Sequence, residues 1–137
     1  MDGLVQVPSL LKKTDQIIMQ VTLPKPPSIN HIYAFTSRGG FARSYITKEG
    51  KTWFEEASKI LKKKYRRKTP IDTEVEVWVT LYTNYYRQDV DNIAKPILDS
   101  LQKNGILVND SLVYKIDIEK FKCKKEEQRV EVEIQGY

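Results

Sequence analysis

Hydrophobic and polar positions recur with two different periods along the chain, and the change of period separates strands from helices. Residues 17–23 form a short β-rich run, and three later segments alternate apolar with polar residues, which is typical of strands with one buried face. These segments are 74–81, 114–119 and 129–134. In 48–65 and 91–104 apolar residues recur three or four positions apart, which predicts two helices, each with one buried stripe.

Local residues indicate where these elements begin and end. Three prolines between positions 24 and 27 end the first strand, because proline lacks the N–H that a central strand needs. Thr47 is suited to cap the first helix, and Gly105 supplies the left-handed residue that often follows a helix. Pro96 lies inside the second predicted helix, where it removes an N–H, so we expect a loosened first turn or a kink there.

The segment 28–45 places Gly39 and Gly40 between aromatic residues, which predicts a hairpin or a mobile loop that carries Arg38 and Arg43. Its aromatic side chains could serve equally in the core or in an interface with another chain. They are Tyr33, Phe35 and Phe41.

The order of elements is strand, helix, strand, helix, strand, strand, with antiparallel neighbours expected at the end. This order predicts an α+β fold: a single domain with a mixed β-sheet and two main helices packed on one face. Residues 1–16 show no sustained period and are interpreted as an N-terminal arm, which leaves 17–137 as the domain.

Composition excludes several classes of site. The chain has 137 residues, 40% hydrophobic and 30% charged, which fits one globular domain and not a disordered chain. Cys123 and His31 are the only residues of their types, so an internal disulfide, a Cys/His zinc site and a Cys-Cys redox pair are excluded. No apolar run approaches the roughly 20 residues of a membrane span, and a signal-peptide pattern is lacking. We therefore expect a cytoplasmic protein without membrane contact.

Charge is distributed unevenly. The formal net charge is +5, and seven basic residues without an acidic one lie between Lys59 and Lys68. Such a run favours a polyanionic partner. It is equally compatible with a solvated helix end whose cations complement the helix dipole.

Carboxylates gather in the second half of the chain. Asp89 and Asp91 are two positions apart, so in an extended segment both project from the same face. Asp110 follows a helix and a short return run, a path that can bring it beside the first pair. Like charges about 4 Å apart repel by roughly 4 kcal/mol at an effective dielectric of 20, so such a cluster favours a cation. Oxygen ligands suit Mg²⁺, with Mn²⁺ as a substitute. Alternatively, the aspartates are helix caps and surface charges.

Helical spacing places Lys95 between Asp91 and Asp99 within an 80° arc, opposite the buried stripe. Three roles for this lysine stay open. It could hold the attacking water, neutralise charge on a phosphate in the transition state, or only pair with Asp99 one helical turn away.

Taken together, these segments resemble the RusA family of Holliday-junction resolvases, over roughly residues 17–134. The matching motifs are RQDVDN at 87–92 with Lys95, LDSL at 98–101, GILVND at 105–110 and LPKPPSIN at 23–30. The resemblance implies a homodimeric, Mg²⁺-dependent endonuclease that binds four-way junction DNA and nicks two opposing strands symmetrically. By position, the metal-binding and catalytic aspartates of the family fall on Asp89, Asp91 and Asp110, and its catalytic lysine falls on Lys95.

The leading hypothesis is therefore a crossover junction endodeoxyribonuclease whose basic side chains contact DNA phosphates. The predicted contacts are Arg38, Arg43, Lys62, Lys63, Lys64, Arg66, Arg67 and Arg87. Two alternatives stay open: a non-catalytic nucleic-acid-binding module, and a metal-dependent nuclease that acts on other branched DNA.

Overall fold

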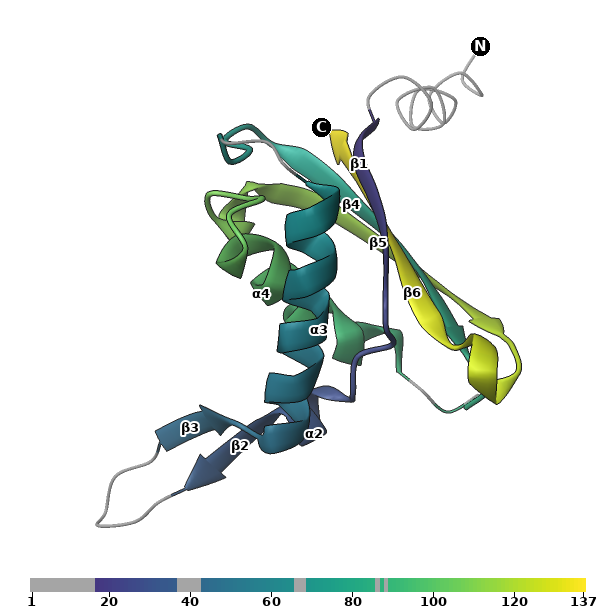
Figure 1. Cartoon of the computed structure of the whole chain (residues 1–137). Helices are drawn as coiled ribbons and strands as arrows, with labels where there is room; N and C mark the ends of the chain where they lie inside the picture. Colours follow the sequence, from purple (N-terminus) through teal and green to yellow (C-terminus); the bar gives the residue numbers. More distant parts are fainter. Residues whose placement is uncertain (1–16, 37–42, 66–68, 86, 88) are drawn as a thin grey trace.

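A four-stranded sheet forms one layer of the molecule, and the helices α3 (Lys48–Lys64) and α4 (Ala94–Lys103) cover one of its faces (Figure 1). A hairpin of β2 (Tyr33–Thr36) and β3 (Arg43–Ile46) projects from the beginning of α3, away from the sheet. This computed structural model describes residues 17–36, 43–65, 69–85, 87 and 89–137, so the predicted arm at 1–16 lies outside the described residues. The predicted α+β fold with two helices on one face is confirmed.

The sheet has the strand order β1-β6-β4-β5. Its strands are β1 (Ile17–Leu23), β4 (Val75–Thr83), β5 (Val113–Lys122) and β6 (Arg129–Gly136). β6 lies antiparallel to both β1 and β4, whereas β5 runs parallel to β4. The expectation of antiparallel neighbours at the end of the chain holds for β6 but is wrong for β5, which is parallel to β4 and does not pair with β6. Because α4 returns the chain to the end where β4 begins, β5 must run in the same direction as β4, and β6 then crosses to the other side of β4.

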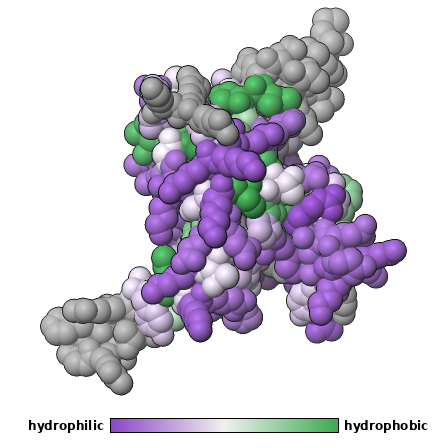
Figure 2. Space-filling view, viewed as in Figure 1, coloured by the Kyte–Doolittle hydropathy of each residue, from purple (hydrophilic) through white to green (hydrophobic). Residues whose placement is uncertain are grey.

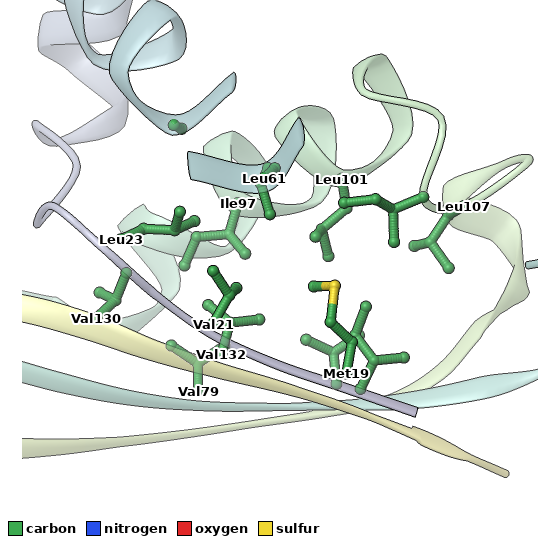
Figure 3. Packing of buried hydrophobic residues seen from close by; sticks show 14 of the residues in the cluster. Met19, Val21, Leu23, Leu61, Val79, Ile97, Leu101, Leu107, Val130 and Val132 are labelled. Atoms are coloured by element: carbon green, nitrogen blue, oxygen red, sulfur yellow. The ribbon is translucent and has the colours of Figure 1, made fainter. Parts of the chain in front are cut away.

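The core lies between the sheet and the two helices. Figure 3 shows Leu61 of α3 with Ile97 and Leu101 of α4 above apolar side chains of the strands. The strand residues labelled there are Met19, Val21, Leu23, Val79, Val130 and Val132. The predicted buried stripes of the two helices are confirmed, although Ile60 of α3 and Leu98 of α4 are only partly buried. No helix among the described residues is both long enough and apolar enough to span a membrane.

The second helix begins later than its sequence pattern predicts. The chain first makes a turn of 3₁₀ helix, η3 (Val90–Ile93), and α4 begins at Ala94. Pro96 then falls within the first turn of α4. Residues in the first turn of a helix have no intrahelical acceptor for their N–H, so the missing N–H of proline costs no hydrogen bond there. The expected loosened turn is thus η3. Gly105, with φ of +72°, follows the end of α4 as predicted.

Close packing fixes the base of the hairpin on α3. Thr47 caps α3, since its Oγ1 accepts a hydrogen bond from the N–H of Gly50 at 3.1 Å. The Thr47 N–H donates to the carbonyl of Ile32, the last residue of the short helix α2 (Ile29–Ile32), at 2.8 Å. A Cβ on Gly50 would lie 2.9 Å from Ile32 Cγ2 and 3.0 Å from Ile46 Cγ2. Glycine is therefore required where the hairpin meets the helix.

Candidate active site

Asp89 and Asp91 lie at the start of the segment that leads into α4. Asp89 precedes η3 in an extended conformation, yet its side chain accepts no capping hydrogen bond, and Asp91 lies in the first turn of η3. Both residues are exposed, and within the described part of the chain neither carboxylate has a hydrogen bond or an ion pair. The expected extended segment is wrong, because the chain turns at this point. The interpretation of Asp89 as a side-chain cap is equally unsupported, and both carboxylates remain available for a ligand.

Asp110 lies near the other end of α4. It begins the short helix η4 (Asp110–Leu112), and its N–H donates a hydrogen bond to Oε1 of Gln102 at 2.9 Å. Gln102 is separated from Asp91 by roughly 16 Å along the helix, at about 1.5 Å per residue. No three potential metal ligands among His, Cys, Asp and Glu gather anywhere in the described ranges. The expectation that the return run brings Asp110 beside Asp89 and Asp91 within one chain is therefore wrong, because a rigid helix separates them.

Lys95 is the second residue of α4, with its side chain 54% exposed and its Nζ 3.4 Å from Oδ2 of Asp99. This confirms the predicted geometry of the pair. Tyr33, at the first position of β2, donates a hydrogen bond from its hydroxyl to the same Asp99 oxygen at 2.5 Å. The Lys95 Nζ also lies 5.0 Å from the centroid of the Tyr33 ring. Sequence reasoning missed this contact, because Tyr33 and Asp99 are 66 positions apart and no local pattern connects them.

A network of hydrogen bonds holds the end of β4, from which the chain leads to Asp89. Oε1 of Gln128 accepts from the Lys25 ammonium at 3.1 Å, from the N–H of Asn84 at 3.1 Å and from the Thr83 hydroxyl at 3.3 Å. Lys25 also donates to Thr83 Oγ1 at 3.2 Å. Burial lowers the pKa of Lys25, although the charge of Cys123 acts in the opposite direction. Lys25, in the PKP segment at 24–26 of the LPKPPSIN motif, thus contributes a side chain that holds the end of β4 in place.

A basic groove runs between α3 and the end of α4. A cavity of about 520 Å³ is lined by lysines from both helices, Lys51, Lys59, Lys62 and Lys103, and by a single carboxylate, Glu55. Phe54 forms part of the wall, and Lys103 Nζ lies 5.0 Å from its ring centroid. A second cavity of about 290 Å³ shares Phe54 and Lys103 and includes Asp99. The groove therefore continues towards Lys95 on a largely hydrophilic face of the molecule (Figure 2).

The predicted phosphate contacts are only partly described. Lys62, Lys63 and Lys64 are exposed in the last turn of α3, and Arg87 is exposed in the loop before Asp89. Arg43 begins β3, but its side chain lies outside the described residues, as do Arg38, Arg66 and Arg67. Sequence reasoning missed the groove lysines Lys51 and Lys103, because a shared groove depends on how α3 and α4 pack.

Comparison with known proteins relates this arrangement to one family. The family model described as endodeoxyribonuclease RusA matches residues 24–135. A protein of Escherichia coli O139:H28 named crossover junction endodeoxyribonuclease RusA is 29% identical over 96 residues, 68% of this chain and 74% of the relative. The protein of that name from Aquifex aeolicus is 32% identical over 68 residues, 49% of this chain and 53% of the relative.

The family match begins within the PKP motif and ends in β6, so it includes the segments that carry Asp89, Asp91, Lys95 and Asp110. It also spans the hairpin and both helices that line the basic groove. The predicted resemblance is confirmed, and this chain belongs to the RusA family of endodeoxyribonucleases.

Proposed function

We propose that the protein is a Mg²⁺-dependent endonuclease that resolves four-way DNA junctions by symmetric paired nicks as a homodimer. The observation that carries the proposal is a pair of exposed carboxylates, Asp89 and Asp91, which have no partner among the described residues and lie six and four positions before Lys95. Family membership supports an endonuclease, and the names of the relatives support a crossover junction as its substrate.

The donor set fits a hard divalent cation. Asp89 and Asp91 offer exposed carboxylate oxygens, and Mg²⁺ is commonly held by one or two carboxylates together with substrate phosphate and water. When bound, Mg²⁺ would acidify a water and polarise the scissile phosphate, with Mn²⁺ as a substitute. Lys95, the first cation along α4 from these carboxylates, would stabilise negative charge that develops on the phosphate.

A second copy of the chain would supply the third carboxylate. β5 is an edge strand of ten residues that pairs with β4 on one side only, and it carries exposed apolar and aromatic side chains. These are Tyr114, Ile116 and Phe121. Long edges of this kind favour pairing with another strand. In a two-fold antiparallel pair, the beginning of one β5 faces the end of the other, so Asp110 of each chain approaches the partner's η3, which packs against β5.

DNA would approach the side of the helices. The strand register places five carboxylates on the opposite, open face of the sheet against two basic side chains, so that face repels phosphates. The carboxylates are Asp117, Glu119, Glu131 and Glu133, which are accessible, and Glu76, which is buried; the cations are Lys115 and Arg129. The groove lysines and the exposed end of α3 have the opposite balance of charge and would hold the backbone of one junction arm.

The experiment is incubation with a labelled synthetic four-way junction, with Mg²⁺ and without metal. We expect two symmetric nicks that require Mg²⁺ or Mn²⁺, and no cleavage of linear duplex of the same sequence. Binding without cleavage in either metal would favour a non-catalytic module. Faster cleavage of flaps or linear duplex would favour a nuclease with a different target.

A further inference from the structure

Tyr33 belongs to the hairpin, yet its side chain reaches the helix that carries Lys95. Its hydroxyl and the Lys95 ammonium contact the same oxygen, Oδ2 of Asp99, and the ammonium also lies 5.0 Å from the centroid of the tyrosine ring. A carboxylate and an aromatic ring both attract an ammonium group. We call these three side chains, Tyr33, Asp99 and Lys95, the lysine clamp.

The lysine clamp restricts the position of the Lys95 ammonium more than the ion pair with Asp99 alone would. Lys95 is more than half exposed and has a flexible four-carbon stem, and an exposed ion pair one helical turn apart is weak. Asp99 by itself would therefore leave the ammonium many orientations. Tyr33 comes from a different element and contacts both Asp99 and Lys95, so it limits the movement of both side chains.

The backbone next to Tyr33 is fixed by burial and by a hydrogen bond. Ile32, the preceding residue, is fully buried, and its carbonyl accepts the hydrogen bond from the Thr47 N–H at the start of α3. Burial raises the pKa of Tyr33, and the hydrogen bond to Asp99 and the charge of Asp99 raise it further. The hydroxyl therefore stays protonated, and remains a donor, throughout the neutral pH range.

We propose that Tyr33 and Asp99 are positioning residues for Lys95, which hold its ammonium on the side of α4 nearest the proposed reacting phosphate. This inference rests on the proposed nuclease function. It also connects the hairpin to the active site, because any displacement of the hairpin by bound DNA reaches Lys95 through the Tyr33–Asp99 hydrogen bond. Positioning of this kind accelerates the reaction without adding to the affinity for DNA.

The first test is Tyr33→Phe, which keeps the ring and removes the hydroxyl. Single-turnover cleavage of a pre-bound junction in Mg²⁺ should slow by about tenfold, since a poorly placed group loses much of its effect. Junction affinity measured in Ca²⁺ should stay within about twofold, because no phosphate contact is removed. Tyr82→Phe is the matched control: it removes a hydroxyl from the open face of the sheet and should leave both quantities unchanged. An unchanged or faster rate in Tyr33→Phe would overturn the proposal.

A double-mutant cycle separates positioning from a general structural effect. If Tyr33 acts through Asp99, the double variant Tyr33→Phe, Asp99→Asn should cleave no more slowly than the slower single variant. Independent, multiplicative losses would contradict a shared route to Lys95.

A spectroscopic readout keeps this inference separate from the nuclease function. The NMR signals of the Lys95 ε-methylene, assigned with Lys95→Ala, should be shifted by the Tyr33 ring in the wild-type protein and should move towards those of solvated lysines in Tyr33→Leu, which removes the ring. If the junction is not cleaved but this change is seen, the clamp stands and the proposed function fails. Signals that are identical in both proteins would refute the clamp, whatever the activity.

Discussion

The two ends of α4 carry the candidate catalytic groups, but they are constructed differently. At the N-terminal end, Asp89 and Asp91 have no side-chain partners among the residues that the structure describes, and Lys95 is oriented by Tyr33 from a distant part of the sequence. At the C-terminal end, Asp110 lies in a segment fixed by local contacts, because its own N–H is bound by Gln102 only eight positions earlier. One end depends on long-range packing, and the other is determined by nearby sequence.

This difference bears on how the site is assembled. Both ends present exposed carboxylates, and the length of the helix separates them, so the described residues of one chain provide three acidic ligands at neither end. Each end of α4 is ordered by its own contacts and can contribute its carboxylates as one half of a site shared by two chains. A two-fold dimer that pairs the β5 edges would bring an N-terminal half of one chain towards a C-terminal half of the other.

The largest effect is expected from loss of a carboxylate at either end. Asp89→Asn, Asp91→Asn and Asp110→Asn should each reduce junction cleavage below detection, because each removes charge from the proposed Mg²⁺ site. Junction binding, measured by gel shift in Ca²⁺, should be retained, since less negative charge faces the DNA. Glu131→Gln, on the open face of the sheet in the inner strand β6, is the control and should cleave normally. Normal cleavage by a variant at either end would remove that residue from the site.

Lys95→Ala should have the next largest effect. The loss of one cation beside the transition-state phosphate is expected to slow single-turnover cleavage by about a hundredfold. Affinity for the junction should change little, because a single phosphate contact contributes only a small part of DNA binding. A wild-type rate would mean that Lys95 is only the partner of Asp99.

Two glycine substitutions compare the contacts that support the two ends of α4: Gly50 lies in α3 at the base of the hairpin that carries Tyr33, and Gly105 directly follows α4. Gly50→Ala should lower the free energy of unfolding by about 1–3 kcal/mol, because the new Cβ overlaps Ile32 and Ile46 at the hairpin base. Gly105→Ala has open space around the new Cβ, so only the left-handed φ opposes it, at about 1 kcal/mol. Urea unfolding measures both. Cleavage should also slow in Gly50→Ala, because the substitution displaces Tyr33. Equal cleavage rates of the two variants would argue against a contribution of Tyr33 to the N-terminal end of α4.

Much of this architecture could be predicted from local sequence. The alternation around Val77 and the Thr47 cap identify strands and helices because these signals depend on neighbouring residues. The parallel pairing of β5 with β4 could not be read in this way, since it depends on where α4 returns the chain. The Tyr33–Asp99 contact escaped prediction for the same reason. The separation of Asp110 from Asp91 follows from helix length, but only once the chain between them is known to run straight.

The most direct test of the composite site mixes two inactive proteins. Asp91→Asn and Asp110→Asn chains with different affinity tags are co-expressed, and heterodimers are isolated through both tags. If each site combines an N-terminal half from one chain with a C-terminal half from the other, one site of the heterodimer carries both substitutions and the second is intact. Our account therefore predicts that the heterodimer nicks a single strand of a four-way junction in Mg²⁺, while each parent homodimer is inactive. A heterodimer that binds the junction but nicks neither strand would contradict it.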